Sequence, residues 1–110
     1  MSSTSGSNRT QLPTGEVDLT ADELFSVLSD RRRRCVLSAL YREDDQLTRE
    51  SLTAELAHGT QDDPREAAVH LHHLVLPKLE GTTLVSCPNE ELVALTSDGS
   101  SVATWLDAVT

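Results

Sequence analysis

The 110-residue sequence contains no isoleucine, one residue each of Phe, Tyr and Trp, one lysine and two cysteines. Cys35 and Cys87 are too few for a disulfide scaffold and lack the CxxC spacing of a zinc site. No apolar run approaches the roughly 18–20 residues of a membrane span, and residues 1–20 lack the apolar stretch of a signal peptide. These absences predict a cytoplasmic protein with one small domain and no membrane contact.

The chain is strongly acidic, with 18 Asp and Glu against 9 Lys and Arg and a net charge of −9. Nucleic-acid-binding domains usually show a basic face instead. However, an excess of acid, with arginine favoured over lysine, also keeps a chain hydrated in molar salt, where a Debye length of ~3 Å screens self-repulsion. We therefore expect a halophilic protein, whose net charge does not exclude DNA binding.

Local patterns predict four helices in the first two thirds of the chain. Residues 1–18 lack periodicity and predict a disordered tail, which leaves residues 19–110 as the domain. Thr20 and Glu23 form a capping box for the first helix, and Ser29–Asp30 offers a cap for Arg31–Tyr41. These two segments form either separate helices or one kinked helix.

A polar loop, Arg42–Asp45, precedes a third helix that Thr48 caps and His58–Gly59 ends. Asp63–Pro64 begins the fourth helix, which Pro77 is expected to kink or interrupt. Its predicted core residues are Ala68, Leu71, Leu74 or Val75, and Leu79.

Residues 84–87 and 92–96 predict a hairpin, and Ser97–Asp98 caps a last amphipathic helix. The order predicts a mainly α (α+β) fold, a winged helix-turn-helix with a two-stranded wing and a C-terminal helix.

Leu28–Leu40 resembles the opening of ArsR-type winged-helix regulators, with Arg31 in place of the family's Pro. Leu52–Ala57 and Val69–Val85 are similar to that family's third helix and its recognition helix running into the wing. The Arg run and the H-x-x-L-P-K-L element also resemble an uncharacterised, presumed DNA-binding family from halophilic archaea. The resemblance implies a transcription regulator that binds double-stranded DNA as a homodimer.

Under this resemblance, residues 64–76 are the recognition helix, whose outer face enters the major groove. That predicted face comprises Arg65, Glu66, Ala67, His70 and His73. Alternatively, it is an exposed polar surface without a ligand. Two observations oppose DNA: residues 61–110 carry a net charge of −6, and the wing tip, Asn89–Glu91, is acidic.

The run Arg31–Arg34 offers a second candidate site. Arg31, Arg32 and Arg34 either contact phosphate or form a solvated face. For Arg33, on the edge of the buried face, we expect an ion pair with a carboxylate such as Asp22, Glu23 or Asp44.

The last helix carries an apolar stripe, which either folds back as core or forms a homodimer contact with the first helix. The predicted interface residues are Leu24, Phe25, Val102, Trp105, Leu106 and Val109.

His70, His72 and His73 supply too few donors for a metal site, and no catalytic or cofactor motif is present. We expect no enzyme activity, cofactor, metal or small-molecule effector. The main hypothesis is a DNA-binding transcription regulator, and the alternative is a winged-helix protein-interaction module that does not bind DNA.

Overall fold

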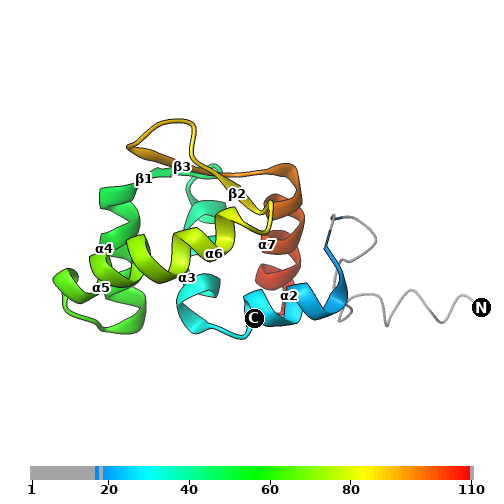
Figure 1. Cartoon of the computed structure of the whole chain (residues 1–110), viewed down its shortest axis with the longest axis horizontal. Coiled ribbons are helices and arrows are strands. Elements are labelled where there is room, and N and C mark those ends of the chain that lie inside the picture. The colour runs from blue at the N-terminus through cyan, green and yellow to red at the C-terminus, as the bar shows by residue number, and fades with distance from the viewer. Residues whose placement is uncertain (1–16, 18, 110) are drawn as a thin grey trace, which may run out of the picture.

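The computed structural model describes Val17 and residues 19–109, which form a group of helices beside one small sheet (Figure 1). The rest of the predicted tail lies outside the described residues. In chain order the elements are α2 (Ala21–Leu28), α3 (Arg31–Arg42), β1 (Gln46–Thr48), α4 (Arg49–Thr60), α5 (Pro64–His70), η2 (Leu71–Val75), α6 (Leu76–Glu80), β2 (Val85–Ser86), β3 (Leu92–Leu95) and α7 (Ser97–Val109). This order confirms the winged helix-turn-helix fold, with α2 before it and α7 after it.

Local capping chemistry sets the helix starts. The Thr20 hydroxyl accepts from the Glu23 N–H, and the Glu23 carboxylate accepts from the Thr20 N–H, which confirms the capping box. The Asp30 carboxylate accepts from the Arg32 N–H and caps α3, so α2 and α3 are separate helices. Thr48 caps α4 as predicted.

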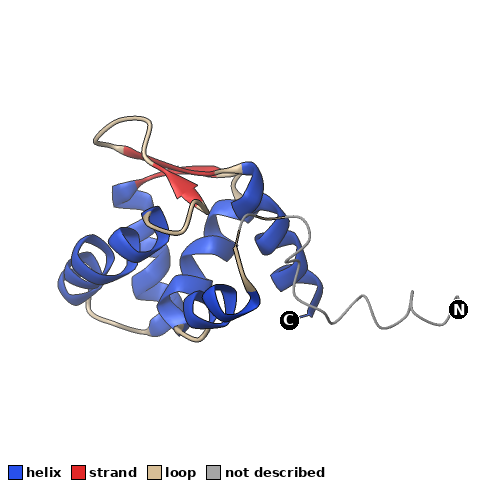
Figure 2. Ribbon diagram, turned by 45° about the vertical axis from the view of Figure 1, so that its right-hand side comes forward, coloured by secondary structure: helices blue, strands red, loops and turns tan. Residues whose placement is uncertain are grey.

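The wing belongs to a three-stranded antiparallel sheet with the strand order β1-β3-β2. Figure 2 shows this sheet along one side of the molecule, with the helices below it. The predicted hairpin is present as β2 and β3, with Val85 opposite Leu95. A third strand that the sequence did not predict joins the two-stranded wing, because Gln46 pairs with Ala94. Three residues with little apolar character become a strand only where a distant partner is available.

Residues 64–80 form one continuous helical segment with a wide turn in its middle, η2. There the Leu76 N–H donates to the Leu71 carbonyl five residues back, instead of four. Pro77 follows this turn and lies in the first turn of α6, where its missing N–H costs little. The wide turn thus lets the helix continue past a residue that was expected to disrupt it.

The wide turn also changes which side chains face the core. Leu74, predicted as a core residue, is 60% exposed, and its alternative Val75 is buried. Ala67, predicted on the outer face, is fully buried, while Ala68 is only half-buried. The wide turn sets the register that buries Val75 in place of Leu74, and Ala67 lies in α5, which packs against α4.

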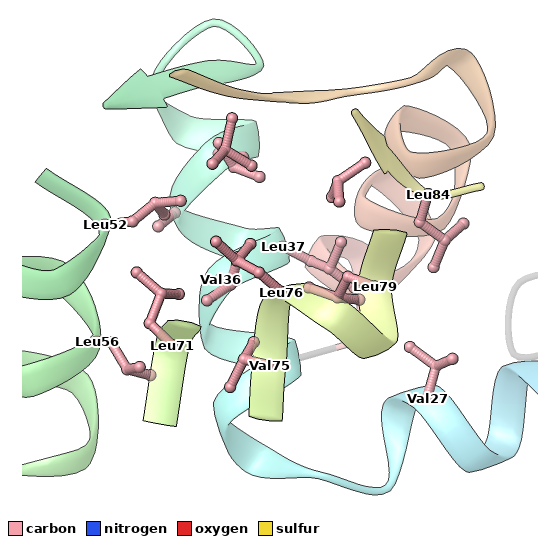
Figure 3. Packing of buried hydrophobic residues seen from close by; sticks show 14 of the residues in the cluster. Val27, Val36, Leu37, Leu52, Leu56, Leu71, Val75, Leu76, Leu79 and Leu84 are labelled. Atoms are coloured by element: carbon pink, nitrogen blue, oxygen red, sulfur yellow. The ribbon is translucent and has the colours of Figure 1, made fainter. Parts of the chain in front are cut away.

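The core is aliphatic, and among the described residues no buried side chain is polar or charged. Its residues come from α2, α3, α4, the segment 64–80, the sheet and α7. Figure 3 shows these side chains meeting around α3. The largest fully buried residues are Leu24, Leu37, Leu40, Leu52, Leu56, Leu71, Leu76, Leu79 and Leu84.

Half of the predicted dimer residues belong to this core. The side chains enclosed within the chain are Leu24, Val102 and Leu106. α7 packs against α3 and β3, and of these three residues Leu106 keeps a small exposed part that lines a surface groove. The predicted residues that reach the surface are Phe25, which is 63% exposed, Trp105, which is half-buried, and Val109. Phe25 therefore does not belong to the buried face of its helix.

Gly59 lies inside α4 instead of ending it, which corrects the predicted helix stop. The left-handed cap residue is Gln61, with φ of 61°. Gly59 is explained by packing: a Cβ there would lie 2.7 Å from the Cys35 sulfur. A small residue is needed at this point because α3 and α4 approach closely.

Replacing Gly59 with Ala should destabilise the protein by about 1–3 kcal/mol, the usual cost of overpacking. In a Cys35→Ala background the same change should instead stabilise it by about 0.5–1 kcal/mol, because alanine is favoured over glycine inside a helix. Urea denaturation in 2–3 M KCl measures both effects. An equal loss of stability in both backgrounds would place the obstruction elsewhere.

Candidate nucleic-acid interface

The four arginines Arg31–Arg34 begin α3, where the helix dipole already places positive partial charge. Two of them donate to the end of α2. Arg33 Nη1 lies 2.9 Å from the Ser26 carbonyl oxygen, and Arg34 Nη1 lies 2.6 Å from that of Leu28. Carbonyls at a helix C-terminus have no partner within the helix, so these guanidinium groups satisfy them and oppose the negative end of the α2 dipole.

The other two arginines reach the end of α4 and the turn after it. Arg31 Nη2 donates to the Gly59 carbonyl at 3.2 Å, and Arg32 Nη2 lies 3.5 Å from Asp62 Oδ2. We call the four side chains the arginine clamp, because together they join α3 to α2, α4 and the helix-turn-helix turn.

Arg33 has the ion pair expected of it, but with a different partner. Its Nη2 lies 3.4 Å from Asp30 Oδ2, the carboxylate that caps its own helix. Within residues 19–109, Arg33 forms no ion pair with Asp22, Glu23 or Asp44. The clamp residues predicted as phosphate contacts, Arg31, Arg32 and Arg34, therefore each have a bond within the chain.

The predicted recognition helix, residues 64–76, lies within the helical segment 64–80 and presents Arg65, Glu66 and His73 at the surface as predicted. His70 is set apart from them, because its side chain is only 27% exposed and its Nδ1 lies 3.6 Å from Asp62 Oδ2.

Sequence reasoning missed Val69 as a surface residue of the recognition helix. It is 51% exposed and follows Arg65 by four residues, hence on the same side of the helix. The spacing in the sequence could have predicted this exposure. Val69 lies two residues from both Ala67 and Leu71, which is about 200° around an α-helix from each.

The Lys and Arg side chains differ in whether they bond to another residue of the chain. Within residues 19–109, six arginines have a hydrogen bond or ion pair to another residue of the chain: Arg31, Arg32, Arg33, Arg34, Arg42 and Arg49. In the same part of the chain the Lys and Arg residues without such a bond are Arg65 and Lys78. Both are exposed, Arg65 on the predicted recognition helix and Lys78 two residues past its predicted end.

A polar cluster connects the wing to the recognition helix. The Cys87 thiol donates to Glu80 Oε2 at 2.7 Å and accepts from Arg49 Nη2 at 3.4 Å. Arg49 Nη1 also lies 3.5 Å from His72 Nδ1. Burial and the hydrogen bond to Glu80 raise the pKa of Cys87 to about 11, so the thiol stays protonated at neutral pH. The cluster holds the wing by hydrogen bonds rather than supplying a reactive thiolate.

An apolar groove of about 260 Å³ lies on another part of the surface, between α2, the start of α3 and α7. Phe25 and Trp105 form its aromatic part, Leu28 and Leu106 line it, and Arg34 borders it. It contains two of the predicted dimer residues that reach the surface.

Residues 19–109 contain no group of three or more His, Cys, Asp or Glu side chains that could hold a metal ion. No helix in that range is long and apolar enough to span a membrane.

The element order, the three-stranded sheet and the exposed recognition helix define a winged helix-turn-helix protein. A family described as a domain of unknown function, DUF7344, matches residues 25–94, and the chain belongs to that family. The matched residues run from α2 to β3 and leave α7 outside. No curated protein and no solved structure matches the chain.

Replacing Arg34 with Ala should lower the free energy of unfolding by about 1–2 kcal/mol, because the Leu28 carbonyl loses a charged donor. Arg65→Ala removes the same side chain from an exposed position without a bond, and should change stability by less than about 0.5 kcal/mol. Urea denaturation of the two variants provides the comparison. Equal stabilities would show that the clamp is not structural.

Proposed function

We propose that this protein is a DNA-binding transcription regulator that uses the recognition helix in the major groove. One observation carries the proposal: of the described Lys and Arg side chains, those left without a bond inside the chain are Arg65, which lies on that helix, and Lys78, two residues past its predicted end. The resemblance to ArsR-type regulators and to a presumed DNA-binding family from halophilic archaea supports it.

The chemistry of the exposed face suits base contacts. Arg65 can donate two hydrogen bonds to O6 and N7 of guanine, and Glu66 can accept from the amino group of cytosine. His73 adds a donor to a base or a phosphate. In molar salt, counterion release contributes little to affinity, so such base contacts have to supply most of it.

Selection of duplexes from a random library in 2–3 M KCl tests this proposal. We expect an enriched site, and a loss of about 10- to 100-fold in affinity for it on Arg65→Ala, the usual value of one bidentate base contact. Arg42→Ala is the matched control, because it removes the same charge from an exposed residue that pairs with Glu55. No enrichment above a random duplex would end the DNA proposal.

The second candidate is a protein-interaction module without DNA binding. The acidic wing tip favours it, since Glu90 and Glu91 are exposed where a wing would approach phosphates. If the protein is folded but selects no duplex, the protein-interaction function is the candidate that remains.

We further propose a homodimer in which the groove around Phe25 and Trp105 meets the same groove of a second copy. Such a two-fold interface would match a palindromic DNA site. An exposed phenylalanine beside a half-buried tryptophan forms an apolar surface of the kind found in interfaces.

Sedimentation equilibrium in 2–3 M KCl should therefore give twice the mass of the chain. Phe25→Glu should give the monomer, because it places a charge in the contact. Leu74→Glu is matched in exposure, at 60% against 63%, and should remain a dimer. A monomeric wild-type protein, or a dimeric Phe25→Glu variant, would overturn this interface.

A further inference from the structure

Val69 is an apolar side chain in the middle of the face that the proposed function directs at DNA. It is 51% exposed, one helical turn after Arg65 and one turn before His73. Its position about 200° from Ala67 and Leu71 keeps it out of the core, since both of those residues are fully buried. The fold therefore does not need a branched apolar residue at position 69.

The major groove offers one apolar group to such a side chain, the C5-methyl of thymine. A methyl–valine contact removes apolar surface of both partners from water, which is favourable in any salt concentration. This property suits a protein whose other contacts cannot rely on counterion release.

The spacing of Val69 and Arg65 places their contacts close together on the DNA. Side chains four residues apart on a helix lie about 6 Å apart, which is between one and two steps of 3.4 Å along a DNA strand.

We infer that Val69 is a specificity-determining residue that contacts the methyl group of a thymine one or two base pairs from the guanine bound by Arg65. This inference rests on the proposed function, and adds to it one base, thymine, that the bound DNA site must contain.

Deoxyuridine tests it, because it lacks only the C5-methyl of thymine. In the duplex selected by the wild-type protein, each thymine is replaced by deoxyuridine in turn, and affinity is measured in 2–3 M KCl. We expect a loss of about three- to fivefold at one position, the value of one buried methyl group.

The variants assign that methyl contact to a residue. Val69→Ser should bind the thymine and uracil duplexes equally, whereas Val69→Ile should still prefer thymine. Leu74→Ser is the matched control, an exposed apolar residue of the same helix that should keep the preference.

The outcomes separate the two proposals. If a duplex is selected but uracil is tolerated everywhere, or if Leu74→Ser and not Val69→Ser removes the preference, the inference fails and DNA binding stands. If no duplex is selected, the proposed function itself fails, and the inference about Val69 fails with it.

Discussion

Four arginine side chains lie at the start of α3, where the helix dipole already places positive partial charge. They are stable there only with negative groups or carbonyl oxygens close by, and the neighbouring elements supply these partners. The arginine clamp takes the free carbonyls at the end of α2, the Gly59 carbonyl in the last turn of α4 and the carboxylate of Asp62. Two segments of the chain, residues 26–28 and residues 59–62, are held to the start of α3 by these bonds. The contacts of the aliphatic core have no preferred direction. The hydrogen bonds of the clamp do, and they orient α2 and the end of α4 relative to α3.

The clamp also changes what the net charge of −9 says about function. The most basic segment of the sequence serves the fold, with six of the described arginines bonded inside the chain. The basic side chains that remain, Arg65 and Lys78, lie in the more acidic half. Any DNA contact then depends on the shape and chemistry of one helix face rather than on an extended positive surface.

Several predictions that rest on neighbouring residues are confirmed, whereas Gly59 and Ser97 lie inside the helices that they were expected to end and to cap. Thr20, Asp30 and Thr48 cap their helices, and Pro64 begins the fourth helix, because the groups involved lie within one turn of each other. The hairpin follows from two apolar segments and a short connection. For the same reason the order of elements, and with it the winged helix-turn-helix fold, is predictable from the chain.

The failures concern residues whose surroundings come from elsewhere in the chain. Gly59 is small because Cys35 lies against it, β1 exists because β3 is beside it, and the wide turn before Pro77 decides that Val75 and not Leu74 is buried. Arg34 donates to a carbonyl of α2, a bond that the sequence did not predict. Local sequence thus predicts where most of the helices begin, since caps and periodicity act over a few residues. Which polar groups remain free for a partner depends on long-range packing, and only the tertiary structure decides it.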